Sequence, residues 1–425
     1  MQFLSATEAV QCVKSHDHIH ISSAAQIPHI LLEALAERAD RGELSDIHFH
    51  HSYSEGVALY ADQRYDKVFV DETFFVGPAV RAAMKTHRAD YIPTHLVDTQ
   101  KLYRKGVVKC DVAFIVVSHP DDNGCVSLGG DVVCTLGAIE VTKTVIAVVN
   151  KFVPFAFGDA RISIDRIHYF VRDNRPLEYS AVTPPTEVEQ KLGEVCADLI
   201  PFGACLQMGV GGLPNALAVA LKNHKHLGLH SEMFADGVME LIKRGVIDNS
   251  RKVIDCGKSV SSFLLGSPEV FKFVHENPDV LMMDIGYTNS PATIAKNPNV
   301  ASVNAAVQID LTGQVCADSV GTRIISGTGG QLDFVEGANL SENGISIIAL
   351  TSRTKDGLSK IVPTLHVGAG VVTPRADVNW IATEYGAVNL YGKGLKERAK
   401  LLISIAHPDD REWLERTAFE RFGRI

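Results

Sequence analysis

The stretches Leu206-Gln-Met-Gly-Val-Gly-Gly-Leu-Pro214 and Leu227-Gly-Leu-His-Ser-Glu232 together predict a strand, a glycine turn, a helix and a second strand. The first strand covers Ala204–Met208 and the helix about Asn215–Asn223, with Pro214 where a first helical turn tolerates proline. Ligands of open α/β sheets bind at the carboxyl ends of the strands. The second strand, Leu227–His230, therefore brings Glu232 to the binding edge.

Three interpretations of this unit follow from the residues alone. Gly209-Val-Gly211 begins like the dinucleotide fingerprint G-x-G-x-x-G, and Glu232 stands about 20 residues on, where a ribose-binding acid is expected, but Pro214 occupies the third glycine position. Alternatively, Glu232 is a covalent nucleophile and the N–H groups of the glycine loop stabilise the anion it generates. The third interpretation is a structural turn followed by a solvated acid.

Composition limits the class of protein. A chain of 425 residues is long enough for two domains, and 46% hydrophobic with 21% charged residues is ordinary for a soluble globular protein. A net charge of −9 without basic runs argues against nucleic acid as a partner. No apolar stretch reaches the ~18 residues of a membrane helix, and the N-terminus lacks the pattern of a signal peptide.

The cysteines and histidines give no metal motif. The eight cysteines are scattered without a C-x-x-C pair, which is typical of reduced core residues in a reducing, cytoplasmic compartment. His48-x-His50-His51 has no nearby Cys or carboxylate in the sequence to complete a site. We therefore expect no metal, and interpret these histidines as residues of a strand end or of the surface.

Strands alternate with helices along the chain, which predicts an α/β fold with largely parallel sheets. The polar, Pro-containing segment Asp173–Glu187 predicts a boundary between domains at 1–180 and 186–425, and an amphipathic helix follows it with Val188, Leu192, Val195 and Leu199 on one face. The clearest strands are Val112–Val117, Val145–Val149, Val253–Asp255, Val280–Asp284, Ala305–Ile309 and Ser346–Leu350.

Two further patterns concern the ends and halves of the chain. Ser5-x-x-Glu8 predicts a capping box that opens a helix. The residues from Asp111 to Gly129 and from Val303 to Gly321 each contain an apolar strand, a polar turn with Gly and a second short strand. This repetition indicates two tandem copies of one fold.

Several motifs, in order along nearly the whole chain, resemble those of one family. Leu229-His-Ser-Glu-Met-Phe-Ala-Asp-Gly237 resembles the active-site segment of class I coenzyme A transferases, closest to the acetyl-CoA hydrolase/transferase branch, which includes the 4-hydroxybutyrate and butyrate CoA-transferases. Gly209–Pro214 is similar to its CoA-binding glycine loop and Gly327-Thr-Gly-Gly-Gln-Leu-Asp-Phe334 to its second glycine loop. Further segments fit the same family: Tyr91–Pro93, Asn150–Gly158, Thr383–Leu390 and Ile405–Arg411.

The resemblance implies two similar stacked α/β domains with the active site between them. It implies transfer of CoA between an acyl-CoA and a small carboxylic acid, with Glu232 as the nucleophile and Gln207 orienting it. CoA would be a substrate with no tightly bound cofactor, and the family suggests a homo-oligomer. The residues implied in CoA binding and oxyanion stabilisation are Gly209, Val210, Gly211, Gly212, Leu213, Gly327, Gly329 and Gly330.

Alternatives stay open at this point. Glu384, or Glu342 in Ser341-Glu-Asn-Gly344, could be the nucleophile instead, although we interpret Ser341–Gly344 as a hairpin turn. The protein could be an acyl-CoA hydrolase on the same scaffold, an NAD-dependent oxidoreductase, or a non-catalytic sensor of CoA esters.

Roles outside the nucleophile also stay open. Arg323 and Arg353 either meet CoA phosphates or are solvated. The acid substrate would bind in the first domain, near Ile21–Pro28. Three aromatic side chains could form an apolar wall of that pocket or belong to the core, namely Phe74, Phe75 and Tyr91.

Overall fold

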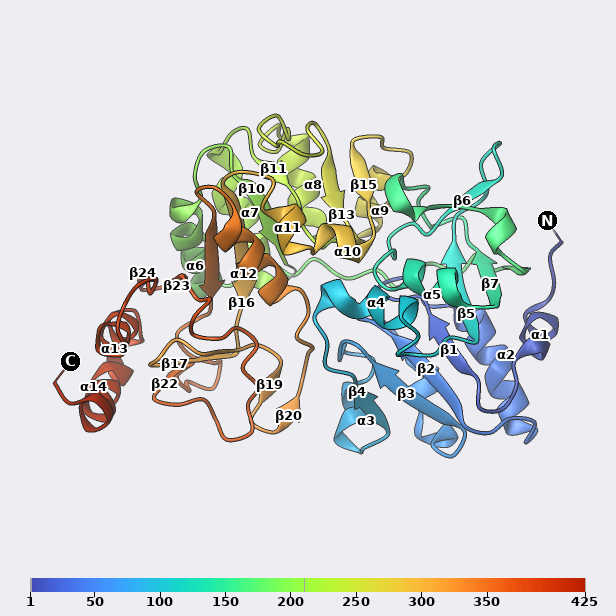
Figure 1. Ribbon diagram of the computed structural model, residues 1–425, viewed down its shortest axis with the longest axis horizontal. Coiled ribbons are helices and arrows are strands. Elements are labelled where there is room, and N and C mark those ends of the chain that lie inside the picture. Colours follow the sequence, from blue (N-terminus) through green and yellow to red (C-terminus); the bar gives the residue numbers. More distant parts are fainter. Residues whose placement is uncertain (1, 210, 425) are drawn as a thin grey trace. The chain divides into compact units, whose positions relative to one another are not determined.

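The computed structural model describes residues 2–209 and 211–424, and the chain divides into two compact units (Figure 1). The first unit contains Met1–Ala181, Glu232–Asp236 and Val260–Thr288. The second unit contains Val182–Ser231, Gly237–Ser259 and Asn289–Ile425. The chain therefore passes between the units several times.

A seven-stranded parallel sheet in the order β4-β3-β2-β1-β5-β7-β9 forms the centre of the first unit. All six residues of β5 are apolar and buried, as expected for a strand inside a parallel sheet with both faces covered. The strands are β1 His18–Ile21, β2 Ile47–His51, β3 Phe69–Thr73, β4 Ala89–Tyr91, β5 Val112–Val117, β7 Thr144–Val149 and β9 Tyr169–Arg172.

Helices and shorter strands complete the first unit. Its helices are α1 Ala6–Ala9, α2 His29–Asp40, α3 Arg81–Lys85, α4 Thr99–Arg104, α5 Thr135–Val141, α9 Pro268–Val274 and α10 Ile285–Thr288. The shorter strands include the antiparallel pair β6 Cys125–Ser127 and β8 Arg161–Ser163, and the parallel pair β12 Met233–Phe234 and β14 Phe263–Leu264. Strand β13 Ser259–Ser261 pairs with β15 Val280–Met282.

The second unit has a six-stranded sheet in the order β11-β10-β16-β21-β23-β24. Its strands are β10 Cys205–Met208, β11 Gly228–Leu229, β16 Val300–Ala305, β21 Ile345–Ala349, β23 Trp380–Thr383 and β24 Gly386–Asn389, and only β24 pairs antiparallel. Smaller strands are β17 Gln308–Asp310, β18 Val315–Cys316, β19 Ser319–Val320, β20 Arg323–Ile324 and β22 Ile361–Val362. The helices are α6 Glu187–Leu199, α7 Gly212–Ala220, α8 Asp236–Lys243, α11 Pro291–Ile294, α12 Gln331–Leu340, α13 Leu395–Ser404 and α14 Pro408–Phe422.

The two sheets share one strand order. The order β2-β1-β5-β7-β9 of the first unit has its counterpart in β11-β10-β16-β21-β23 of the second. In each order, the strand that comes first in the chain, β1 or β10, lies between the two of these strands that follow it in the chain. The chain therefore adds one strand on one side of β1 or β10 and later continues on the other side. The prediction of two similar, largely parallel α/β domains is thereby confirmed. Among the described residues, no helix combines the length and apolar composition that crossing a membrane requires.

Local signals determine several of these elements. The predicted capping box at Ser5 and Glu8 is present at the start of α1, and Thr186 and Glu189 form another at the start of α6. Helix α6 is the predicted amphipathic helix, and it packs against α7 where Gly193 faces Ala216. A Cβ at Gly193 would stand 2.8 Å from the Ala216 carbonyl carbon, so glycine permits the close approach.

Three predicted elements are wrong. Val253–Asp255 is a bend, in which the Asn297 side chain accepts from the amides of Val253 and Ile254 at 2.9 and 3.1 Å. Ala305–Ile309 spans the end of β16 and the start of β17. Ser341–Gly344 connects helix α12 to strand β21, so it is not a hairpin turn.

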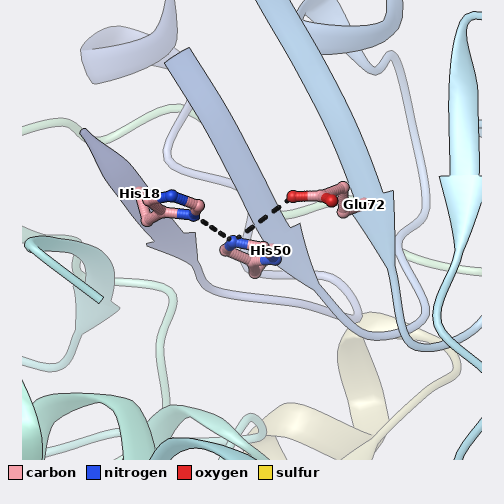
Figure 2. Close-up of side chains that lie close together, drawn as sticks. All are labelled: His18, His50 and Glu72. Carbon is pink, nitrogen blue, oxygen red and sulfur yellow. Dashed lines mark hydrogen bonds and ion pairs between the residues drawn. The ribbon is translucent and has the colours of Figure 1, made fainter. Parts of the chain in front are cut away.

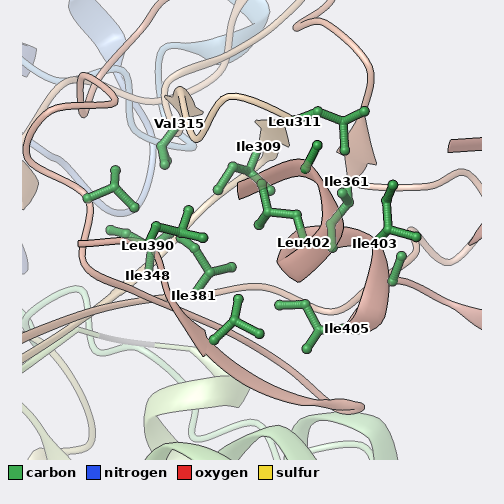
Figure 3. Packing of buried hydrophobic residues seen from close by; sticks show 14 of the residues in the cluster. Ile309, Leu311, Val315, Ile348, Ile361, Ile381, Leu390, Leu402, Ile403 and Ile405 are labelled. Atoms are coloured by element: carbon green, nitrogen blue, oxygen red, sulfur yellow. The ribbon is translucent and has the colours of Figure 1, made fainter. Parts of the chain in front are cut away.

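One apolar cluster of the second unit lies under the two C-terminal helices. Figure 3 shows aliphatic side chains of β17, β21, β22 and β23 packed with those of α13. Leu402 on α13 is completely buried there, whereas its neighbour Leu401 is only partly buried. The packing of α13 and α14 therefore depends on this cluster.

Leu402→Ala should lower the free energy of unfolding of the second unit by about 2–5 kcal/mol, because it leaves a cavity in a close-packed core. Both tryptophans, Trp380 and Trp413, belong to the second unit, so urea unfolding followed by tryptophan fluorescence reports on it. Leu401→Ala is the matched control and should cost less. Equal losses in the two variants would contradict the packing.

Candidate active site

The segment around Glu232 is held through its backbone. The Glu232 carbonyl accepts hydrogen bonds from the amides of Ser262 at 2.9 Å and Phe263 at 3.0 Å, and the next two residues form β12. Glu232 itself is half-buried. Asp236 opens α8, and its carboxylate accepts from the amide (3.0 Å) and the hydroxyl of Ser267. Asp236 therefore acts as a turn residue at the base of α8.

The strand that precedes Glu232 is fixed by two buried side chains. β11 contains only two residues at the edge of its sheet, and Leu229 bonds to side chains there. Asn249 Oδ1 accepts from the Leu229 amide at 2.8 Å, and Lys252 Nζ donates to the Leu229 carbonyl at 2.9 Å and to the Lys258 carbonyl at 2.7 Å. Burial lowers the pKa of Lys252. These bonds fix where the chain leaves β11 toward Glu232.

The first glycine loop opens helix α7. Gly211 is the residue before the helix and has φ +116°, a conformation that favours glycine. Pro214 lies in the first turn, as predicted. Gly212 faces the carboxylate of Glu189, which a Cβ at Gly212 would overlap. Val210, predicted as part of this loop, lies outside the described residues.

A cavity of ≈ 480 Å³ in the second unit adjoins this loop. Gly212, Leu213 and Pro214 form one part of its lining, and residues at the carboxyl ends of β16 and β21 form another. This is the position expected for a ligand site in an α/β sheet. Its charged lining residues are Glu189, Arg353, Lys355 and Lys360.

Two of the cationic side chains in this cavity differ in availability. Arg353 forms ion pairs with Asp410 at 2.6 Å and Asp409 at 3.2 Å, and these carboxylates raise its pKa. Lys360 donates to Thr351 Oγ1 at 3.0 Å, and burial lowers the pKa of Lys360. Among the described residues Lys360 forms no such ion pair, and it is therefore the better candidate to meet an anion. Arg323 lies exposed on β20 and does not line the cavity.

The second glycine loop precedes helix α12. Gly329 has φ +60°, and Gly330 is the residue before the helix. Gln331 connects this loop to its surroundings: its Nε2 donates to the Ala305 carbonyl at 2.8 Å, and its Oε1 accepts from Thr373 Oγ1 at 3.0 Å. Ala305 lines the cavity, but the three glycines Gly327, Gly329 and Gly330 do not.

Gln207, predicted to orient Glu232, lies on β10 with its amide paired to Asn304. Gln207 Nε2 donates to Asn304 Oδ1 at 3.3 Å, and Asn304 Nδ2 donates to Gln207 Oε1 at 3.1 Å. This reciprocal pair connects neighbouring strands β10 and β16.

The other two candidate nucleophiles have different surroundings. Glu384 accepts from the Ser352 amide at 2.8 Å and the Ser352 hydroxyl at 2.6 Å, which ties the chain after β23 to the chain after β21. Glu342 is exposed in the turn between α12 and β21. Glu384 thus has a visible supporting role, and Glu342 lies on the surface.

In the first unit, the segment after β1 is buried, and the side chain of its Gln26 bonds to the backbone of other segments. Gln26 Nε2 donates to the carbonyls of Val116 at 3.0 Å and Leu128 at 2.9 Å, and its Oε1 accepts from the Gly130 amide at 2.6 Å. Phe74 is buried in the core, whereas Phe75 and Tyr91 are half-buried. Of the three aromatic residues considered for the acid pocket, Phe74 is thus a core residue.

Sequence reasoning missed two features. His50 and His51 are 2% and 0% exposed, so the interpretation as surface histidines is wrong for them, and Glu72 of β3 lies beside His48 and His50. The cationic residue Lys360 was also missed, because no local motif marks it. The register of β2 with β3 places Glu72 beside His50, but this register is known only once the fold is known.

The fold and the cavity define an α/β protein with a ligand site at the carboxyl ends of its strands, and comparison with known proteins shows that it is an enzyme of the CoA-transferase class. Residues 1–179 match the acetyl-CoA hydrolase/transferase N-terminal domain, and residues 266–418 match the acetyl-CoA hydrolase/transferase C-terminal domain. The chain belongs to the acetyl-CoA hydrolase/transferase family.

Relatives match over nearly the whole chain. The succinyl-CoA:acetate/propanoyl-CoA:succinate CoA transferase of Fasciola hepatica is 42% identical over 412 residues, covering 96% of this chain and 86% of that protein. The 4-hydroxybutyrate coenzyme A transferase of Clostridium kluyveri is 41% identical over 424 residues, covering 99% and 98%. The crystal structure of RipA from Yersinia pestis superposes with a TM-score of 0.93 at 33% identity, covering 99% and 97%.

Lys252→Met should destabilise the second unit by about 1–3 kcal/mol, because the carbonyls of Leu229 and Lys258 would lose a buried donor. We also expect faster amide hydrogen exchange in the peptide that contains His230–Glu232. Urea unfolding and exchange mass spectrometry measure the two effects. The exposed Lys222→Met is the control and should change neither; unchanged exchange in Lys252→Met would refute the positioning role.

Proposed function

We propose that the protein transfers CoA between a short-chain acyl-CoA and a free carboxylate such as acetate, butyrate or 4-hydroxybutyrate, with Glu232 as the nucleophile. The observation that carries this proposal is the full-length similarity to CoA transferases that act on such acids. The way the Glu232 segment is held supports the proposal. The Glu232 carbonyl accepts from backbone amides at the start of β14, and Asn249 and Lys252 bond to the preceding strand β11.

The chemistry solves a specific difficulty, because a free carboxylate attacks a thioester poorly. In the proposed reaction, the Glu232 carboxylate attacks the acyl-CoA carbonyl, which gives an acyl-glutamyl anhydride and CoA thiolate. The thiolate then attacks the glutamyl carbonyl, which releases the first acid and leaves a glutamyl-CoA thioester. The second acid repeats both steps in reverse and leaves as its CoA ester.

Each step passes through a tetrahedral oxyanion, so fixed N–H donors contribute most of the stabilisation. We propose that the glycine loops supply them, from Gly209 to Leu213 and from Gly329 to Gly330. Both loops lead into helices, α7 and α12, whose first amides lack partners within the helix. Amides at a helix start suit an anion for the same reason.

We propose that the cavity beside the first glycine loop binds the CoA moiety. Phosphate groups need cationic partners, and Lys355 and Lys360 line this cavity together with Arg353. Apolar lining residues such as Leu192 and Leu213 could contact the less polar pantetheine arm. Binding energy gained there would position the thioester for attack.

An acyl-CoA hydrolase on the same scaffold would use the same intermediates, with water as the final acceptor. The difference is measurable: a hydrolase releases CoA thiol continuously without an acid acceptor. A transferase retains the glutamyl-CoA thioester until an acid is added. Assays of thiol release with and without acetate therefore separate the two functions.

Incubation of the full chain with butyryl-CoA or acetyl-CoA should add CoA as a thioester to the peptide that contains Glu232, detected by peptide-mapping mass spectrometry. Glu232→Gln should lose the adduct and at least about 10³-fold of the activity, because it removes the nucleophile. Glu384→Gln and Glu342→Gln are matched controls that should retain the adduct. An adduct on Glu342 or Glu384, or none on any glutamate, would overturn the assignment of Glu232.

Lys360→Met should weaken CoA binding by about tenfold, because it removes a charge that faces the cavity. In the wild type, affinity should fall as the pH rises through the lowered pKa of Lys360, since only the protonated amine attracts phosphate. Calorimetric titration with CoA across this pH range should show a weaker pH dependence in the variant. Lys222→Met is the control, because Lys222 is exposed and does not line the cavity. Equal affinities of Lys360→Met and wild type would refute the assignment of the cavity.

A further inference from the structure

Three adjacent parallel strands of the first unit carry histidines and a carboxylate on one face of their sheet. His18 pairs in register with His48, and His20 with His50, across β1 and β2. His50 pairs in turn with Glu72 across β2 and β3. Residues two apart on a strand point to the same face, and so do partners in register. The five side chains therefore gather on one face.

Figure 2 shows three of these side chains converging, namely His18, His50 and Glu72. His18 Nδ1 lies 2.9 Å from His50 Nε2, and His50 Nε2 lies 3.6 Å from Glu72 Oε2. One potential ligand atom from each residue lies within 4.8 Å of the other two. Two donors on one tetrahedral Zn²⁺ are about 3.3 Å apart. The two measured separations bracket this value, so small side-chain rotations would suffice.

Neighbouring side chains hold this group in place. His48 Nδ1 lies 3.0 Å from Glu72 Oε2, its Nε2 lies 3.2 Å from Asp46 Oδ1, and its ring stacks on the His18 ring with centroids 4.5 Å apart. Such partners orient metal ligands. His20 is engaged elsewhere, because its two ring nitrogens bond to Tyr103 at 3.0 Å and Thr135 at 2.9 Å.

The buried ring of His50 has one nitrogen left over for a proton. A neutral imidazole is the form that binds metals. His50 Nδ1 is buried without a hydrogen-bond partner among the described residues. When Nδ1 carries the proton, Nε2 directs a lone pair toward His18 and Glu72.

We propose that His18, His50 and Glu72 bind a divalent cation of borderline softness, Zn²⁺ foremost. Two imidazoles and a carboxylate form a donor set that suits this ion, with the remaining position filled by water. The side chain of Glu72 is 27% exposed and the side chain of His50 only 3%, so the ion would enter from the side of Glu72. The bound ion would join β1, β2 and β3 and stabilise the first unit. The residues proposed for CoA transfer take no part.

The test uses the full chain after removal of metal with EDTA. Calorimetric titration with ZnCl₂ should give one saturable site per chain, and Co²⁺ should give the visible absorption of a tetrahedral complex. Glu72→Gln and His50→Ala should each weaken Zn²⁺ binding at least tenfold, and Zn²⁺ should raise the thermal midpoint of the wild type but not of these variants.

The matched control is His16→Asn. His16 forms an exposed pair with Asp46 at 2.8 Å and lies outside the group, so its replacement should leave the affinity unchanged. Circular dichroism without metal shows whether His50→Ala folds, and Glu72→Gln preserves the shape of the side chain if it does not. Absence of a saturable site in the wild type, or wild-type affinity in Glu72→Gln, would overturn the proposal and leave a hydrogen-bonded histidine group.

Discussion

Both units depend on the pairing of one strand, β1 or β10, with parallel partners on both sides. Parallel neighbours require crossover connections, and these are right-handed. Because the chain proceeds in opposite directions on the two sides, successive crossovers cover opposite faces of the sheet. The loop that follows β1 or β10 therefore lies at the switch point where α/β sheets bind ligands. In the second unit that loop is the first glycine loop.

A repeated turn supports the same symmetry at the level of single hydrogen bonds. Asp121 accepts from the amides of Asn123 at 3.0 Å and Cys125 at 2.8 Å, and Asp310 accepts from those of Thr312 at 2.9 Å and Gln314 at 3.1 Å. A glycine with positive φ completes each turn, with φ +70° at Gly124 and +93° at Gly313. A Gly-Gly pair then precedes α5 or α12, and its first glycine has φ +60° in both. The strand-and-turn pattern that the sequence repeats in its two halves thus corresponds to equivalent turns in the structure.

The sequence predicted those elements whose causes are local. The buried apolar run Val112–Val117, the helix Glu187–Leu199 with its capping box, and the glycine turns before α7 and α12 all have short-range signals. The errors arise where a distant residue decides the backbone. Val253–Asp255 is apolar enough for a strand, but the Asn297 side chain accepts from the amides of Val253 and Ile254 and holds the segment in a bend. The carboxylate beside His50 comes from another strand, so no spacing in the sequence reveals it.

The candidate site shows the same limit in a more consequential way. Ser231 belongs to the second unit and the next residue, Glu232, to the first, so the proposed nucleophile stands where the chain leaves one unit for the other. The sequence motif identifies the residue but not the interactions that hold this crossing. Those come from Asn249 and Lys252 on one side and from the amides of Ser262 and Phe263 on the other. Because the backbone is bonded on both sides of this crossing, the proposed nucleophile can keep its position, which covalent chemistry requires.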